Sequence, residues 1–178
     1  NIYYQTKNYY QAEKYFIIAL AVNPQMSSIV HTMAIMFEDM EDTARSDSLF
    51  KYLILQNNND AVGLNDYAYI ISERNNTSLQ ELNFALELAE RAVAMEPDNA
   101  AFLDTIGWIY YKMGTYEKAR EYLEKSLKIN KDNPVILEHM GDIYHKLDTS
   151  DEALILYEKA LLKDTDNKTI QDKINQIN

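Results

Sequence analysis

The chain has 178 residues, of which 47% are hydrophobic and 25% charged, as in an ordinary soluble protein with one domain or one elongated array. Its net charge of −11 argues against binding to nucleic acid or to an anionic membrane surface, because both are polyanions. The absence of cysteine excludes disulfides and thiolate chemistry, and the scarcity of glycine (four) and proline (three) argues against an all-β fold.

Apolar residues recur at spacings of three and four along the chain, which predicts amphipathic helices joined by short loops. After a helical fragment at the start, the expected helices span about 8–22, 27–40, 44–56, 61–73, 79–95, 100–113, 116–129, 134–147 and 150–163. Residues 168–178 place three isoleucines on one stripe of a polar segment, which predicts a terminal capping helix. No apolar run approaches the ~20 residues that cross a bilayer, and no signal peptide is visible.

Helix boundaries are marked by capping residues. Asn133 before Pro134 is typical of a helix start, because proline has no N–H to leave unpaired. Two segments have the pattern of capping boxes that open second helices, Ser78-x-x-Glu81 and Thr149-x-x-Glu152. Gly114 is expected to form the tight turn inside one hairpin.

A pattern of two large residues, a small residue and a further large residue occurs four times. Its copies are Val30/Met33/Ala34/Phe37, Leu64/Tyr67/Ala68/Ile71, Leu103/Ile106/Gly107/Tyr110 and Leu137/Met140/Gly141/Tyr144. Successive copies start 34, 39 and 34 residues apart. The small residue lets a paired helix approach closely, and large residues of the second helices fill the space between hairpins: Phe16, Phe50, Leu123 and Tyr157. A single hairpin cannot bury such a stripe alone, so stability comes from stacking.

This pattern resembles the tetratricopeptide repeat family over essentially the whole chain. The departures are Ser46 in an alanine position, Ala89 in an aromatic position, and a proline slot kept only by Pro24 and Pro97. The resemblance implies an all-α fold, a right-handed superhelical solenoid of stacked antiparallel hairpins. It also implies that the first helix of each hairpin lines a concave groove that binds proteins.

The expected organisation is one array over residues 1–178. It consists of a partial repeat (1–26), repeats over 27–60, 61–99, 100–133 and 134–167, and the capping helix over 168–178. Five extra residues in the third unit fall within 73–81, where they lengthen the loop or add a turn to the second helix. We interpret them as a tolerated insertion, with a contact element at the rim as the alternative.

The first residues are rich in aromatic side chains, and the chain opens inside a first helix whose start is missing. We therefore expect further repeats to precede it in a parent protein. The uncovered apolar surface also predicts self-association through this end.

Candidate partner-binding residues are those that point outward from the first helices. They are His31, Ile35, Glu38, Asn65, Tyr69, Asp104, Trp108, Tyr111, Glu138, Asp142 and His145. Aromatic rings provide rigid contact area at interfaces, and the carboxylates favour a partner with a Lys or Arg. The predicted partner is thus an apolar or basic peptide or helix. The basic residues with which some family members clamp a C-terminal carboxylate are missing from these positions.

Each of these residues also has a structural interpretation. Trp108 can pack against the adjacent first helix, and Asp104, Glu138 and Asp142 can hydrogen-bond between helices and stiffen the array. Tyr69 and Tyr111 have the same two interpretations, and His31 and His139 are expected at the surface or between helices.

Metal and enzyme sites are not predicted. Glu138, Asp142 and His145 share one helix face at i, i+4 and i+7, a set that suits zinc but is equally typical of a solvated face. No phosphate-binding, nucleotide-binding, nucleophile-elbow or zincin motif occurs. We predict no catalytic residue, no metal and no cofactor.

The predicted function is a protein-interaction scaffold or adaptor that binds a partner peptide or helix in its concave groove. The alternative is a structural or self-assembly module of a larger protein, acting through its end faces and convex surface. The repeats look bacterial, and nothing in them chooses between cytoplasm and cell envelope.

Overall fold

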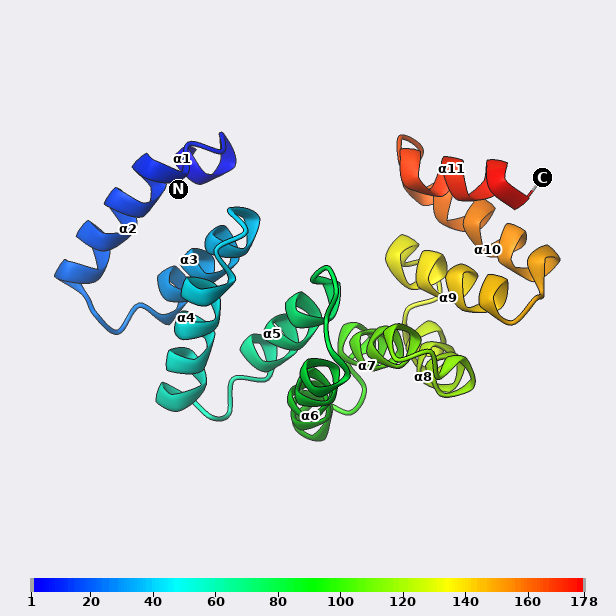
Figure 1. The fold of residues 1–178 in the computed structure, drawn as a ribbon, viewed down its shortest axis with the longest axis horizontal. Helices are drawn as coiled ribbons and strands as arrows, with labels where there is room; N and C mark the ends of the chain where they lie inside the picture. Colours follow the sequence, from blue (N-terminus) through cyan, green and yellow to red (C-terminus); the bar gives the residue numbers. More distant parts are fainter. Residues whose placement is uncertain (1, 178) are drawn as a thin grey trace. The chain divides into compact units, whose positions relative to one another are not determined.

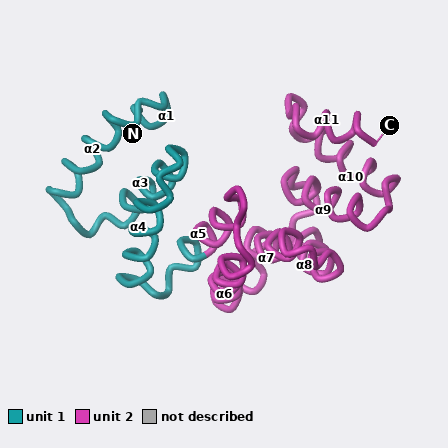
Figure 2. The backbone as a smooth tube through the Cα atoms, in the orientation of Figure 1, with its two compact units in different colours: residues 1–64 teal, residues 65–178 magenta. Residues whose placement is uncertain are grey.

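The computed structural model describes residues 2–177, which within that range form helices and short connections without strands (Figure 1). The chain divides into two compact units, unit 1 over residues 1–64 and unit 2 over residues 65–178 (Figure 2). The all-α fold of helical hairpins is confirmed, and every predicted helix occurs with its ends within about two residues of the expected ones.

Unit 1 contains one complete hairpin and the helices before it. Its helices are α1 (Ile2–Gln5), α2 (Tyr9–Val22), α3 (Ser27–Asp39), α4 (Thr43–Gln56) and the first residues of α5 (Ala61–Glu73). The helices α3 and α4 pack as an antiparallel pair, and α2 lies against α3. Ala12 and Phe16 of α2 are buried there against Met33, Met36 and Phe37 of α3.

Polar contacts support the same packing in unit 1. The hydroxyl of Tyr4 donates a 2.8 Å hydrogen bond to Asp39 at the end of α3. Arg45 of α4 forms a 3.0 Å ion pair with Glu13 of α2, and its guanidinium lies 4.0 Å from the ring centre of Phe37. These contacts link α1 and α2 to the hairpin formed by α3 and α4.

Unit 2 contains the remaining part of α5, the helix that follows it, two complete hairpins and a last single helix. Its other helices are α6 (Leu79–Met95), α7 (Ala100–Lys112), α8 (Tyr116–Ile129), α9 (Pro134–Lys146), α10 (Ser150–Lys163) and α11 (Lys168–Ile177). Contacts run in sequence from α6 to α7, α7 to α8, α8 to α9, α9 to α10 and α10 to α11, and α7 also touches α9. The first helices α7 and α9 therefore contact their own partners and each other.

The small residue of the repeat lets the two helices of a hairpin approach closely. A Cβ atom at Gly141 would lie 2.5 Å from Cε1 of Tyr157, and one at Gly107 would lie 2.0 Å from Cδ1 of Leu123. Both distances are shorter than any real Cβ contact, so the facing large side chains occupy the space that the glycines leave. Tyr157 and Leu123 are fully buried as a result.

Helix starts follow the predicted caps with one exception. Asn133 accepts hydrogen bonds from the N–H groups of Val135 and Ile136, and Ser78 and Glu81 form the reciprocal capping box. The box predicted at Thr149 was wrong. Its hydroxyl instead donates to the carbonyl of Tyr144 at 2.9 Å, where it helps to close the end of α9.

The turns inside the hairpins share one backbone conformation. Gly114 has φ = 74°, which confirms its predicted turn. Glu41 and Asp148, at the same repeat position, have φ = 59°, and Lys7 in the turn before α2 has φ = 56°. This left-handed region suits glycine and strains residues with a Cβ atom.

The five extra residues of the third unit are divided between loop and helix. The connection from α5 to α6 covers residues 74–78, and α6 has 17 residues where α8 has 14. The hydroxyl of Thr77 donates to the carbonyls of Ile71 and Arg74, so the longer loop closes the end of α5. The expected lengthening is confirmed, and it affects both elements.

The last helix covers the final hairpin. Ile170 is fully buried against Leu137, Ala153, Tyr157 and Ala160, and Ile174 and Ile177 pack at the edge of this cluster. The outward positions of α11 are polar and exposed: Gln171, Asp172, Asn175 and Gln176. This burial pattern over residues 168–177 agrees with the predicted capping helix over 168–178, whose last residue lies outside the described range.

Candidate interaction surface

The candidate surface of unit 2 is built from the first helices α5, α7, α9 and the capping helix α11. On each of these helices, one stripe of side chains is buried in the core of its hairpin. The row of side chains beside that stripe faces the first helix of the following hairpin. Charged and aromatic residues in that row contact residues one repeat later. They form a ladder of polar contacts, which we call the inner ladder: Glu73, Asp104, Trp108, Lys112, Glu138, His139, Asp142 and Lys173.

Trp108 lies at the centre of the inner ladder. Its indole is 7% exposed and stacks between Tyr111, at 4.7 Å between ring centres, and His139, at 4.0 Å. Its Nε1–H donates a 2.7 Å hydrogen bond to Oε1 of Glu73 on α5. Lys112 binds the same oxygen at 2.9 Å and lies 5.1 Å from the indole ring centre. The structure thus favours the interpretation of Trp108 as a packing residue between first helices.

Asp104 and His139 form a buried pair. Nδ1 of His139 on α9 is 3.0 Å and 3.1 Å from the two carboxylate oxygens of Asp104 on α7. Both side chains are less than a tenth exposed. His139 was expected at the surface or between helices, and the structure places it between helices.

Glu138 and Asp142 are bound by a lysine from the capping helix. Nζ of Lys173 is 2.7 Å from Oε1 of Glu138 and 2.7 Å from Oδ2 of Asp142. The hydroxyl of Tyr157 donates a further 2.7 Å hydrogen bond to Asp142. Glu138 is therefore bound by a side chain of α11, and Asp142 by side chains of both α11 and α10. Among residues 2–177 no three His, Asp or Glu side chains are arranged to hold a metal ion.

These contacts repeat with a spacing of 35 residues. Glu73 meets Trp108, Asp104 meets His139 and Glu138 meets Lys173, each time from one first helix to the next helix of the row. In unit 1 the same spacing connects Tyr4 with Asp39. Where the repeat is 34 residues, as for Asp104 with His139 and Glu138 with Lys173, a residue one position further along the next helix faces the carboxylate. The step from α5 to α7 is 39 residues, so Trp108 lies four positions before the repeat equivalent of Glu73, which is Lys112.

Burial and neighbouring charges change the acidity of several side chains in the surface. Burial, and then the carboxylates of Glu73, Asp104 and Glu138, raise the pKa of Tyr69 to about 12. Burial and the charge of Asp142 raise the pKa of Tyr111 to about 12. Burial alone would raise the pKa of Glu73, but hydrogen bonds from Lys112 and Trp108 outweigh it and the pKa is lowered.

The predicted site residues differ in accessibility. Asn65, Asp104, Trp108 and Asp142 are buried, and His145 is exposed. The remaining six are partly exposed: His31, Ile35, Glu38, Tyr69, Tyr111 and Glu138. His31, Ile35 and Glu38 belong to unit 1, where His31 borders a hollow of about 200 Å³ next to Asp60 and Gly63.

Sequence reasoning missed four members of the inner ladder, namely Glu73, Lys112, His139 and Lys173. A signal was present, because an acidic residue is followed 35 residues later by a basic one in two of these pairs. Lys112 and His139 each follow a predicted outward position, Tyr111 and Glu138, and so lie just beside the positions that the repeat pattern selects.

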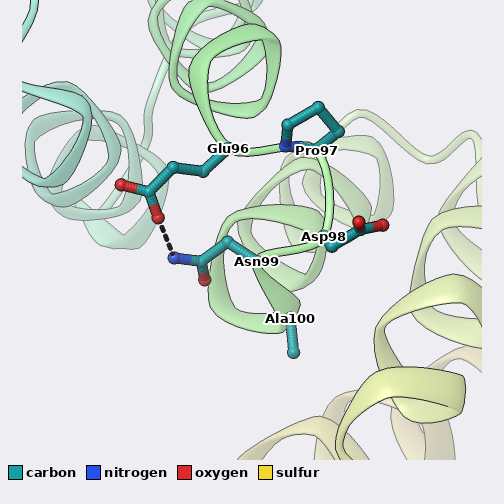
Figure 3. A pocket seen from close by; sticks show the side chains of 5 residues that line it. All are labelled: Glu96, Pro97, Asp98, Asn99 and Ala100. Carbon is teal, nitrogen blue, oxygen red and sulfur yellow. Dashed lines mark hydrogen bonds between the residues drawn. The ribbon is translucent and has the colours of Figure 1, made fainter.

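A second hollow, of about 480 Å³, lies at the connection between α6 and α7 (Figure 3). In the figure the amide of Asn99 points to the carboxylate of Glu96, which accepts its 2.8 Å hydrogen bond. The side-chain oxygen of Asn99 also caps α7 by accepting from Ala101 and Phe102. These polar groups shape the turn, and we assign the hollow no ligand.

Comparison with known proteins places the chain among repeat proteins. Residues 78–160 match the family model of the anaphase-promoting complex, cyclosome, subunit 3. The TPR repeat-containing protein PA4667 of Pseudomonas aeruginosa is 30% identical over 100 residues, which are 56% of this chain and 16% of that protein. The chain therefore spans about one sixth of the length of the curated relative it matches.

Solved structures show the same fold at low sequence identity. TTC0263, a thermophilic TPR protein in Thermus thermophilus, has a TM-score of 0.82 at 22% identity, covering 98% of this chain and 92% of its own. PilW, described as a widely conserved type IV pilus biogenesis factor, has a TM-score of 0.83 at 17% identity, covering 98% of this chain and 80% of its own.

Proteins of this fold are in general non-enzymatic scaffolds for protein interactions. No helix among residues 2–177 is long and apolar enough to cross a membrane. The four-fold pattern, the hairpins and these relatives support a tetratricopeptide-repeat protein of the bacterial type.

Proposed function

We propose that the surface formed by α5, α7 and α9 binds a peptide or helix of a partner protein. The observation that carries this proposal is the ring stack on Trp108, which holds Tyr111 rigidly at the edge of the surface while leaving it partly exposed. A fixed aromatic side chain loses little conformational entropy on binding and is a frequent anchor of interfaces. Tyr69 on α5 offers a second, partly exposed ring.

The charge of the surface supports a partner that is apolar with a basic group. Four carboxylates of the inner ladder face only two lysines and one histidine: Glu73, Asp104, Glu138 and Asp142 against Lys112, Lys173 and His139. The surface therefore stays negative after its internal pairing. Exposed His145 and partly exposed Glu138 lie on α9, where they can contact a polar part of the partner.

The test uses partly exposed residues, because changes at Trp108, Asp104 or Asp142 would disturb the packing of the helices. A peptide library is displayed against the chain, and the affinities of selected peptides are measured by calorimetry. We expect sequences with an aromatic or aliphatic residue next to Lys or Arg. Tyr111→Ala should weaken their binding by about tenfold or more, as for an interface anchor.

The matched control is Tyr52→Ala, which removes a 40% exposed tyrosine from the second helix α4. Circular dichroism must show full helicity for both variants. Equal affinities of the wild type, Tyr111→Ala and Tyr52→Ala would contradict binding at this surface.

A second candidate function, self-association through the N-terminal end, is favoured by the surface of α2. Six large apolar side chains in α1 and α2 are exposed: Ile2, Tyr10, Tyr15, Ile17, Ile18 and Val22. Five of these six lie on α2, and exposed apolar surfaces larger than those of ordinary monomers mark interaction sites. A chain that sediments as a monomer at high concentration would contradict this function.

A further inference from the structure

The helix α2 is apolar on both its buried and its exposed side. Ala12 and Phe16 fill the core of unit 1, whereas Tyr10 is 77%, Ile17 54% and Val22 84% exposed. Charged residues in α2 are limited to Glu13 and Lys14, and Glu13 is already paired with Arg45. A helix that is apolar all round is normally covered on every side.

Comparison with the second helices α8 and α10 shows how this exposed side differs from theirs. Aligning Ala12 with Ala119 and Ala153 superposes the repeat positions of α2, α8 and α10. The positions of Tyr10, Ile17 and Ile18 are then occupied in α8 by Glu117, Glu124 and Lys125. In α10 they are occupied by Asp151, Glu158 and Lys159. Solvent-facing positions of the repeat are thus charged in these two helices and apolar in α2.

We propose that α2 pairs with α2 of a second copy of this chain in a closed, two-fold dimer; this inference rests on the self-association proposed above. We name the surface formed by Tyr10, Ile17, Ile18 and Val22 the α2 face. Standard interfaces bury about 800 Å² per partner, so a dimer centred on these four side chains also buries a rim of residues around them.

A two-fold arrangement follows from the character of the face. It carries one positive side chain, Lys14, and little other charge, so two copies do not repel each other there despite the net charge of −11. The capping helix α11 presents Gln171, Asp172 and Asn175 outward, which are a poor match for an apolar helix. A self-complementary face closes after two copies, whereas a head-to-tail contact would lead to a larger ring or a fibre.

The pairing has a specific register. Two α2 helices that cross antiparallel near residue 16 place Tyr10 of one copy against Ala21 and Val22 of the other. Ile17 then lies close to the two-fold axis, and the flexible stem of Lys14 covers the neighbouring apolar surface while its charge stays in water.

The first experiment measures mass by light scattering over a wide range of protein concentration. We expect the wild type to reach twice the mass of the chain, and Ile17→Glu to raise the dissociation constant by about 100-fold, because each dimer would bury two unpaired carboxylates. Tyr10→Glu is a second variant at the edge of the same face. Both positions are exposed, so circular dichroism and thermal unfolding of the monomer should be unchanged.

The matched control is Ile155→Glu, which alters an equally exposed isoleucine on α10: Ile155 is 51% and Ile17 54% exposed. Since the chain has no cysteine, Ile17→Cys and Ile155→Cys also allow clean cross-linking. We expect a disulfide-linked dimer only from Ile17→Cys.

The outcomes separate this inference from the function on which it rests. A monomer at every concentration would contradict both. Association that survives Ile17→Glu and is lost in Ile155→Glu would overturn pairing through α2 and keep self-association. Assemblies that grow beyond two copies would overturn the two-fold closure.

Discussion

Nδ1 of His139 on α9 lies 3.0 Å from the carboxylate of Asp104 on α7, and neither side chain reaches the solvent to a significant extent. Lys173 on α11 meets Glu138 in the same way one repeat later. Adjacent helices of this row are thus connected by an acid on one and a base on the next, in addition to their apolar packing.

The buried pair predicts a clear order of stabilities. His139→Ala leaves the carboxylate of Asp104 buried without its partner and should lower the free energy of unfolding by about 3 kcal/mol or more. The double variant Asp104→Leu/His139→Leu should recover most of this loss, because no polar group remains unpaired. Urea unfolding followed by circular dichroism measures the difference. A double variant less stable than His139→Ala would contradict the explanation.

The left-handed turns predict stabilising substitutions. Glu41 and Asp148 adopt φ = 59° at the position where Gly114 has φ = 74°. Replacing either by glycine removes the Cβ strain and should raise the free energy of unfolding by up to about 1 kcal/mol, less the entropy that glycine adds to the unfolded chain. Gly114→Ala should lower it by a similar amount. Thermal unfolding checks the signs, and a loss of stability in Glu41→Gly would show that its side chain matters more.

The sequence was sufficient for the helices and their hairpin packing because the repeat combines three independent signals. The small residues Gly107 and Gly141, the facing Leu123 and Tyr157, and the caps at Asn133 and Ser78 all agree with one register. Local rules decide such features. The Thr149 cap failed because its hydroxyl has a second acceptor nearby, the carbonyl of Tyr144, which the pattern cannot rank.

The candidate surface was less predictable, since burial there depends on the next repeat. Trp108, Asp104 and Asp142 occupy the predicted outward positions, yet side chains from α5, α9, α10 and α11 cover them. Whether an outward residue binds a partner or a neighbouring helix depends on side chains 35 residues away.

Acid should weaken the contact of α5 with α7. The pKa of Glu73 is lowered by hydrogen bonds from Lys112 and Trp108, which outweigh the effect of burial. Its contribution to stability is therefore present above the ordinary value of 4.5 and is lost as pH falls through the lower folded value. We expect the urea midpoint to fall in this range, and Glu73→Gln to reduce that fall. Trp108 is the only tryptophan, so its fluorescence reports the change directly.

If the fluorescence of Trp108 and the unfolding midpoint depend on acid in the same way in Glu73→Gln as in the wild type, the contact with Glu73 is not responsible. Glu96→Gln is a suitable control, because this carboxylate lies at the turn before α7 and contacts Asn99.

Alkaline conditions should unfold the chain through its tyrosines. The pKa values of Tyr4, Tyr69 and Tyr111 are raised to about 12 from 10.0, in each case chiefly by burial. The folded state thus favours their neutral form, and the stability they contribute is complete below pH 10 and lost as pH rises toward 12. We expect part of the phenolate absorbance to develop late, together with the loss of helical signal.

Tyr111→Phe removes one of these groups and should reduce the loss of stability between pH 10 and pH 12. Tyr52→Phe, which alters a tyrosine of α4 that is 40% exposed, is the control. If the phenolate absorbance is fully developed near pH 10 while the helices persist, these tyrosines are exposed to water and do not contribute to stability in this way.

The close facing of Gly141 with Tyr157 and of Gly107 with Leu123 has a consequence for how such arrays diversify. Each of these hairpins carries its own matched pair of a hole and the side chain that fills it, so the two helices of a hairpin must be inherited together. Recombination between hairpins keeps each glycine together with the large side chain that packs on it. Recombination inside a hairpin combines a glycine with a side chain that was selected to pack on the first helix of a different hairpin. Genetic exchange at the loops after α8 and α10 can therefore rearrange repeats without compensating substitutions in the hairpins.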